Sequence, residues 1–228
     1  MKRLVLFDID GTLLSAGGIS ARCLSEALLE VFGATGPIEG YDYSGKTDPQ
    51  IVRELMRGAG RDEAEIERNR PLTLSRYADR LRQTLRPEHV RPKPGVADLL
   101  LALAEDARVA MGLLTGNLEA CARVKLAPLA ANGYFPFGAY GSDHEDRYRL
   151  PPVAVARARE VTGLSFVGEE IVVVGDSIHD VLCGRSLGVR AVAVATGRTD
   201  LASLRAHAPA AALEDLSDTG RALAAILG

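Results

Sequence analysis

The chain has 228 residues and a net charge of −3, with 47% hydrophobic and 25% charged residues. This composition is ordinary for a globular protein and excludes fibrous and intrinsically disordered classes. Lysines and arginines are scattered, which argues against a nucleic-acid-binding surface, and no apolar run is long enough to span a membrane. We therefore expect no nucleic-acid and no membrane partner, and the sequence indicates no oligomeric state.

The cysteines and the N-terminus bear on the compartment. The three cysteines are widely spaced and match no zinc pattern, as in a chain that stays reduced. The apolar run at 4–7 is too short for a signal peptide, and Asp8 and Asp10 interrupt it. We expect a cytoplasmic protein.

Apolar runs alternate with helical patterns along most of the chain. Strands are expected at 3–9, 108–114, 137–140, 171–174, 191–195 and 210–212. Helices are expected at 95–105, 119–126, 152–162, 180–187, 201–207 and 217–227. The strongest strand signals are nearly continuous apolar runs, typical of parallel strands covered on both faces. The pattern predicts an α/β fold with a Rossmann-like parallel sheet and right-handed crossovers.

One stretch, residues 16–90, interrupts this alternation. Helices are expected at 21–32, 51–57 and 61–85, and Thr47-Asp-Pro-Gln50 has the form of a capping box before the second. Gly17 and Gly18 open the stretch, and prolines follow it. We predict a core of residues 1–15 and 91–228 and an all-helical cap of residues 16–90. The cap is expected to be a mobile lid, with a fixed helical subdomain as the alternative.

Polar residues follow three of the expected strands. Asp8 and Asp10 follow the first, Thr115 follows the second, and Asp176 and Asp180 follow the third. Ligands of open parallel sheets bind beyond the carboxyl ends of the strands, so these side chains should converge. Four carboxylates in one place would repel one another. A hard divalent cation resolves this, and oxygen ligands favour Mg²⁺.

The same segments carry a family resemblance. Asp8-Ile-Asp-Gly-Thr-Leu13 resembles the first motif of the haloacid dehalogenase (HAD) superfamily, Thr115-Gly-Asn117 the second, and Gly175-Asp-Ser-Ile-His-Asp180 the fourth. The resemblance covers essentially the whole chain. The helical insertion is similar to the C1-type cap of this superfamily, and phosphoglycolate phosphatase-like members have this size and layout.

The resemblance implies a hydrolase in which Asp8 attacks phosphorus and forms an aspartyl phosphate. Asp10 would protonate the leaving alkoxide and then deprotonate the hydrolytic water. Dehalogenases of the superfamily lack an acid at this position, because a halide needs no proton to leave. Asp10 therefore favours a phosphomonoesterase acting on a small soluble metabolite, and phosphoglycolate and sugar phosphates both fit.

The resemblance also implies binding roles. The residues expected to hold magnesium are Asp8, Asp10 through its carbonyl, Asp176 and, in support, Asp180. Thr115 would donate its hydroxyl to the phosphoryl oxygens, together with the backbone N–H of Gly116 or Asn117.

The third motif departs from the family pattern, which has a lysine there. This chain has four lysines and none beyond position 125, so an arginine has to take the role. The prolines that follow favour Arg149. Arg147 stays open, because an extended segment would point both side chains the same way.

Lys46, in the cap, is expected near the active site, where it would bind the far end of the substrate or its phosphate; the alternative is a solvated lysine. It also leaves open a phosphonatase-like hydrolase that uses Lys46 as a Schiff base. A β-phosphoglucomutase-like isomerase is disfavoured because no histidine precedes His89. A non-enzymatic phospho-acceptor module is disfavoured by the chain length and the intact Asp8 and Asp10.

Overall fold

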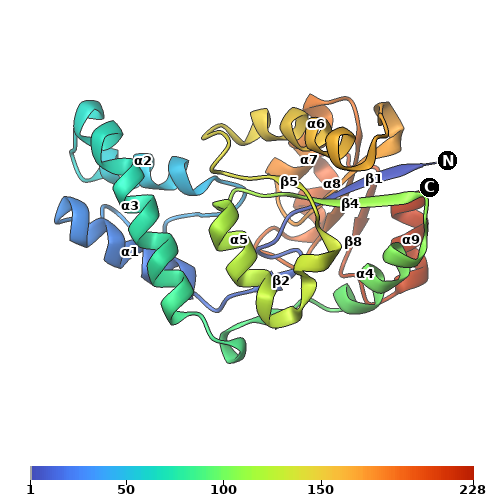
Figure 1. Cartoon of the computed structure of the whole chain (residues 1–228), viewed down its shortest axis with the longest axis horizontal. Coiled ribbons are helices and arrows are strands. Elements are labelled where there is room, and N and C mark those ends of the chain that lie inside the picture. Colours follow the sequence, from blue (N-terminus) through green and yellow to red (C-terminus); the bar gives the residue numbers. More distant parts are fainter. Residues whose placement is uncertain (1) are drawn as a thin grey trace.

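A six-stranded parallel sheet forms the centre of the protein, of which the computed structural model describes residues 2–228. Its strands are β1 (Arg3–Phe7), β4 (Val109–Leu114), β5 (Gly138–Ala139), β6 (Ile171–Gly175), β7 (Arg190–Val194) and β8 (Ala211–Leu213). They lie in the order β5-β4-β1-β6-β7-β8 (Figure 1). The expectation of an α/β fold with a Rossmann-like sheet is confirmed.

Helices cover both faces of this sheet. They are α4 (Val96–Glu105), α5 (Glu119–Leu126), α6 (Leu150–Thr162), α7 (Ile178–Ser186), α8 (Leu201–Ala206) and α9 (Thr219–Leu227). Side chains of a strand alternate between its faces. In β1, Val5 and Phe7 pack in the cluster that includes α4 and α9, whereas Leu4 and Leu6 pack with α6 and α7. Burial on both faces explains why the strands are continuous apolar runs.

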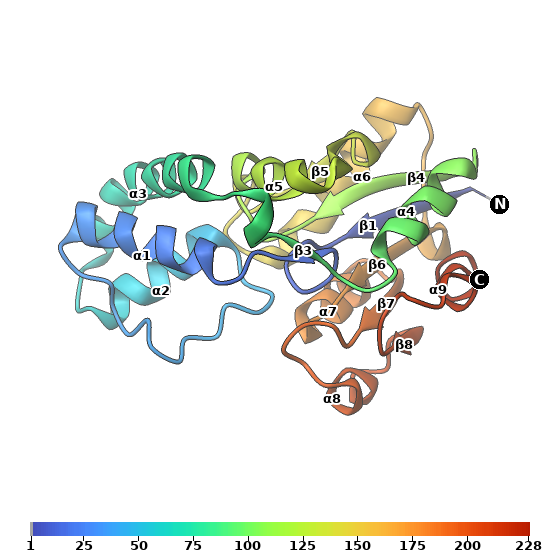
Figure 2. The ribbon, with the colours of Figure 1, turned by 90° about the horizontal axis from the view of Figure 1, so that it is seen from below.

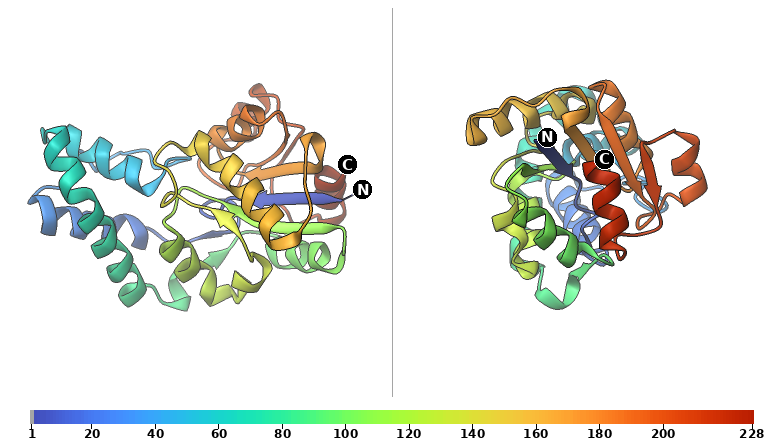
Figure 3. Two further views of the ribbon diagram at one scale, coloured as in Figure 1. Left: turned by 45° about the horizontal axis from the view of Figure 1, so that its top comes forward. Right: turned by 90° about the vertical axis from the view of Figure 1, so that its right-hand side faces the viewer.

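Between the first strand and the rest of the sheet lies a helical insertion, residues 16–90. It contains α1 (Ile19–Phe32), α2 (Asp48–Gly58) and α3 (Glu63–Thr84), and no strand. A short antiparallel ribbon of β2 (Leu14–Ser15) and β3 (Arg91–Pro92) joins its two ends. Figures 1 and 2 show the insertion beyond one end of the sheet, and Figure 3 shows the two termini together at the other end.

The insertion packs against the core as well as against itself. Helix α3 contacts α1, α2 and α5, and one apolar cluster runs from the insertion into the sheet face. The split into core and cap, and the mobility of the cap, stay predictions. Within the described residues, no helix combines the length and the apolar character needed to cross a membrane.

The expected strands and helices of the core and of the insertion are present, with ends that shift by a few residues. The ribbon of β2 and β3 was not predicted, because a strand of two residues has no readable alternation. A short 3₁₀ helix at Arg147–Arg149 was not predicted either, and it changes the assignment of one site residue.

Candidate active site

The strand register brings the motif residues to one edge of the sheet. Phe7 of β1 is level with Leu113 of β4 on one side and with Val174 of β6 on the other. The next residues of all three strands therefore leave the sheet together. The backbone N–H of Asp8 donates to the Val174 carbonyl at 2.9 Å, which holds Asp8 at the carboxyl-terminal edge of the sheet.

The turn after β1 shapes the site around Asp176. Gly11 has a φ of 90°, a left-handed conformation that favours glycine, and a side chain there would run into the Asp176 carboxylate. The hydroxyl of Thr12 donates to Asp176 Oδ1 at 2.9 Å. The Asp-Gly-Thr part of the first motif is thus needed for close packing against the end of β6.

Three carboxylates meet at this edge. Asp8, Asp176 and Asp180 are buried, and each offers an oxygen within 4.8 Å of the others. Burial raises the pKa of Asp8 to about 6, although the positive charge of Arg147 acts to lower it. Burial, with the charges of Asp8 and Asp180, raises the pKa of Asp176 well above its usual value. Such a cluster is unfavourable without a counter-ion.

The charge and ligand chemistry of this cluster fit magnesium. Three carboxylates opposed by the single guanidinium of Arg147 carry a net charge of −2, which a divalent cation balances. All donors are oxygens, as Mg²⁺ prefers. Asp180 is already engaged, since its Oδ2 accepts from the Ser177 N–H at 3.0 Å and the Ser177 hydroxyl at 2.6 Å, and its Oδ1 pairs with Arg147. Asp180 thus suits a supporting position.

Arg147 occupies the position expected of the third motif. Its side chain is 4% exposed, and its Nη2 lies 3.2 Å from Asp8 Oδ1 and pairs with Asp180. The structure brings Arg147, and not the preferred Arg149, to the carboxylate cluster. The segment is a 3₁₀ turn, not an extended strand, so side chains two positions apart point in different directions. Arg149 is 71% exposed, and its nearest acid is Asp146 at 3.9 Å.

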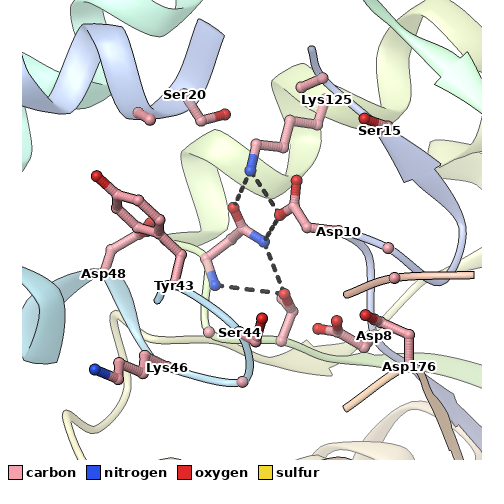
Figure 4. A pocket seen from close by; sticks show the side chains of 18 of the residues that line it. Asp8, Asp10, Ser15, Ser20, Tyr43, Ser44, Lys46, Asp48, Lys125 and Asp176 are labelled. Carbon is pink, nitrogen blue, oxygen red and sulfur yellow. Dashed lines mark hydrogen bonds and ion pairs between the residues drawn. The ribbon is translucent and has the colours of Figure 1, made fainter. Parts of the chain in front are cut away.

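A second network holds Asp10. The ammonium of Lys125 donates to Asp10 Oδ2 and to Asn117 Oδ1, both at 2.6 Å. The amide of Asn117 donates to the same Asp10 oxygen at 2.7 Å and to the Thr115 hydroxyl oxygen at 2.8 Å (Figure 4). The Asp10 side chain stays 44% exposed, so it is fixed at one oxygen and open to the cavity.

Lys125 was missed in the sequence, although it carried a signal. The buried stripe of α5 consists of Cys121, Ala122, Lys125 and Leu126. A lysine on the apolar stripe of a helix needs a buried partner. Burial alone lowers the pKa of Lys125, but the negative charges of Asp10 and Asp48 outweigh it and raise that pKa.

The second motif faces both the cavity and the insertion. Thr115 is fully buried, and the backbone N–H of Asn117 lies 3.4 Å from its hydroxyl. The Gly116 carbonyl accepts from the backbone N–H of Asp48 at 2.8 Å. A side chain at Gly116 would run into the backbone of Lys46. The lack of a side chain at Gly116 therefore lets the backbone of the insertion approach the core closely.

The backbone of Lys46 lies beside Gly116 at the site, whereas its ammonium points toward Glu54. Its Nζ lies 2.6 Å from Glu54 Oε2 and 3.1 Å from the Tyr41 hydroxyl, over the Tyr41 ring. Figure 4 shows the amine directed away from Asp8 and Asp10. The structure does not bring this ammonium to the carboxylate cluster.

A cavity of about 440 Å³ joins these groups. Asp8, Asp10, Thr115 and Asp176 line it from the sheet edge, and the helices of the insertion close it from the opposite side. It is large enough for a small phosphorylated metabolite and lies where the strand ends meet the helices.

The family model for haloacid dehalogenase-like hydrolases matches residues 5–194. The chain belongs to this family. Among its relatives, Phosphoglycolate phosphatase 1 of Pseudomonas aeruginosa is 28% identical over 96% of this chain and 78% of its own. The phosphoglycolate phosphatase of Agrobacterium fabrum is 28% identical over 87% of this chain and 82% of its own.

Solved structures show the same fold. A hydrolase from Pseudomonas syringae superposes with a TM-score of 0.71 at 22% identity, covering 99% of both chains. The resemblance to the HAD superfamily and to its phosphoglycolate phosphatase-like members is confirmed, and with it the prediction of an enzyme in place of a phospho-acceptor module.

Proposed function

We propose that this family member is a magnesium-dependent phosphomonoester hydrolase that works through an aspartyl phosphate on Asp8. The proposal rests on the environment of Asp8. Its buried carboxylate lies between the guanidinium of Arg147 and the carboxylates of Asp176 and Asp180. A carboxylate so placed suits a nucleophile that must accept a doubly charged phosphoryl group.

In this proposal a carboxylate oxygen of Asp8 attacks phosphorus, and the bond to the leaving oxygen breaks. Asp10, held by Lys125 and Asn117, gives that oxygen its proton. The same carboxylate then takes a proton from the water that cleaves the aspartyl phosphate and frees inorganic phosphate. Thr115 and Arg147 stabilise the charge on the phosphoryl oxygens.

Magnesium, when bound, would supply positive charge beside the nucleophile and the phosphoryl group. Asp8 and Asp176, with the backbone carbonyl of Asp10, would hold it, and Asp180 would support it. The names of the relatives and the size of the cavity favour a small soluble phosphate ester as substrate. We propose a cytoplasmic location, which three free, buried cysteines fit.

The placement of Lys46 argues against the phosphonatase-like alternative. A Schiff base requires a neutral amine facing the substrate. The ion pair with Glu54 engages the Lys46 side chain and turns it away from Asp8.

The test is phosphate release from a panel of small phosphomonoesters, with magnesium and with excess EDTA, by wild type and by Asp8→Asn. We expect release that needs the metal and disappears in the variant. Equal release by wild type and Asp8→Asn would refute the mechanism. No release from any ester would refute the phosphatase.

A further inference from the structure

The groups around Asp10 define the side of the cavity that receives the leaving group. If Asp10 protonates the leaving oxygen, the rest of the leaving group has to lie against the neighbours of Asp10, away from Asp176. Lys125 of α5 binds Asp10, and Asp48 of α2 with Ser20 of α1 and Tyr77 of α3 line the same cavity.

The charges on this side leave no excess positive charge for an anion. Lys125 is the cation closest to Asp10, and the charges of both Asp10 and Asp48 act on it. When Asp10 is protonated, as a general acid must be before it gives up its proton, the Lys125 ammonium and the Asp48 carboxylate balance. A carboxylate on the leaving group would meet the charge of Asp48 in a buried place, where repulsion is screened least.

Asp48 is the group with spare hydrogen-bonding capacity. Its side chain comes from the first turn of α2, where Thr47 caps the helix, and the residue is 7% exposed. Oδ2 accepts from the backbone N–H of Leu118 at 2.8 Å, which fixes the carboxylate. Oδ1 has no hydrogen-bonding partner among the described residues. A carboxylate oxygen that lacks a partner next to a cavity favours a ligand that donates a hydrogen bond.

Two hydroxyls share this wall. The Ser20 hydroxyl is buried beside the Tyr77 phenol. Tyr77 is 1% exposed, and burial, followed by the charge of Asp48, raises its pKa well above the usual value, so the phenol stays protonated. The wall is thus polar, although none of the described residues adds an uncommitted cation to it.

The remaining cations at the cavity are engaged or exposed. Lys46 pairs with Glu54. The ammonium of Lys93 donates to the Thr196 carbonyl at 2.5 Å. Arg198 lines the cavity as an exposed side chain, and its charge acts on Asp42 and Tyr43 of the insertion.

We propose that Asp48 is a specificity-determining residue that accepts a hydrogen bond from a hydroxyl or ammonium group of the leaving group. The protein then prefers phosphate esters of alcohols that carry such a donor over esters that carry a carboxylate, in contrast to the substrate named for its relatives. This inference rests on the proposed function, because it takes Asp10 to mark the leaving-group side.

The test uses three phosphomonoesters of equal length that differ in one terminal group: 2-hydroxyethyl phosphate, 2-aminoethyl phosphate and 2-phosphoglycolate. Binding is measured by calorimetry with magnesium in the inert Asp8→Asn protein, and kcat/KM is measured in wild type. We expect the hydroxyl or the ammonium ester to bind at least about tenfold more tightly than phosphoglycolate and to have a kcat/KM higher by the same factor. This is the free energy of about one hydrogen bond to a charged group. The two donor esters show which donor is preferred.

The variant that tests the residue is Asp48→Asn, which keeps an acceptor for the Leu118 N–H and removes the charge. It should reduce the preference against phosphoglycolate about tenfold. Asp42→Asn is the matched control, because it removes a charge from the same insertion at an exposed position that accepts from the Ser44 N–H. It should leave the preference unchanged.

Phosphoglycolate binding tightest of the three, binding of none of them, or an unchanged preference in Asp48→Asn overturns the inference. The ranking by the Asp48-containing protein needs no substitution at position 48, so a failure of Asp48→Asn to fold does not remove the test. The proposed function fails separately, if wild type hydrolyses no ester or Asp8→Asn hydrolyses them all.

Discussion

The two sides of the cavity are built in different ways. The nucleophile side consists of the ends of three adjacent strands, whose register fixes Asp8, Thr115 and Asp176 relative to one another. The leaving-group side is assembled where the insertion meets the core, from helices distant in sequence. The backbone of a central sheet positions the reacting groups, whereas helix packing positions the groups that select the leaving group. Substitutions on the two sides should therefore differ in kind.

The largest effect is expected from Asp8→Asn on the nucleophile side. Because the amide cannot form the acyl phosphate, phosphate release should fall by more than about 10⁴-fold with every ester. Asp98→Asn, an exposed acid in the first turn of α4, is the matched control and should keep wild-type turnover. A variant that retains a tenth of the activity would show that the nucleophile lies elsewhere.

Removal of the metal should also abolish turnover, and it has a readout apart from catalysis. A ligand that binds only the folded state stabilises it by about 2.7 kcal/mol at a hundred times its Kd. For a chain of this size that corresponds to a rise in Tm of roughly 5–10 °C. Magnesium should raise the Tm of wild type and not that of Asp176→Asn. An equal rise in both would place the metal outside this cluster.

Arg147→Ala should lower kcat/KM by about 10²- to 10³-fold, as the loss of one preorganised charge-stabilising group does. It also leaves Asp8 and Asp180 without their guanidinium partner, so the metal-free variant should be less stable. Arg149→Ala changes the same residue type two positions away and should behave as wild type. The opposite ranking would restore Arg149 to the third motif.

A substitution on the leaving-group side, Lys125→Met, should depend on the substrate. Without the ammonium, Asp10 loses a short charge-assisted hydrogen bond, and alkyl esters should lose about ten- to a hundredfold in kcat/KM. Phosphorylation of Asp8 by 4-nitrophenyl phosphate should slow much less, because that leaving group departs without a proton. Rapid-quench kinetics separate this step. Equal losses for both esters would mean that Lys125 acts only on the fold.

The smallest effect is expected where the insertion is tied to the core. Arg53 and Arg70 of the insertion pair with Glu145, at 2.5 and 2.6 Å. The contacts are partly exposed and should contribute roughly 0.2–1 kcal/mol each. Glu145→Gln should raise KM by less than about fivefold and mainly at low salt, whereas Glu169→Gln, an exposed acid of the core, should change nothing. No change at any ionic strength would show that this tie does not affect binding.

The contrast between the two sides also explains what the sequence could predict. Asp8, Asp10, Thr115, Asp176 and Asp180 were readable because buried parallel strands must end at one edge. The sheet was readable for the same reason, since burial on both faces leaves continuous apolar runs.

Three features depend on local geometry and helix packing, which the sequence pattern did not show. The prolines that follow favour Arg149, whereas the 3₁₀ turn places Arg147 beside Asp8. The role of Lys125 was missed because this residue lies on a helix, and no sequence pattern links that helix to Asp10, which follows the first strand. The capping box at Thr47 is half formed: Thr47 accepts from the Gln50 N–H, but the Gln50 side chain bonds Glu54, and the helix begins at Asp48.

The most direct test of the central claim is to trap the phosphorylated enzyme. Wild type would be mixed with magnesium and a phosphomonoester that it hydrolyses, quenched in acid within one turnover, and mapped by mass spectrometry of its peptides. We predict one added phosphoryl group, on the peptide that contains Asp8, at Asp8 itself and absent from Asp8→Asn. Turnover without a phosphorylated peptide, or with the phosphoryl group on another residue, would contradict the account.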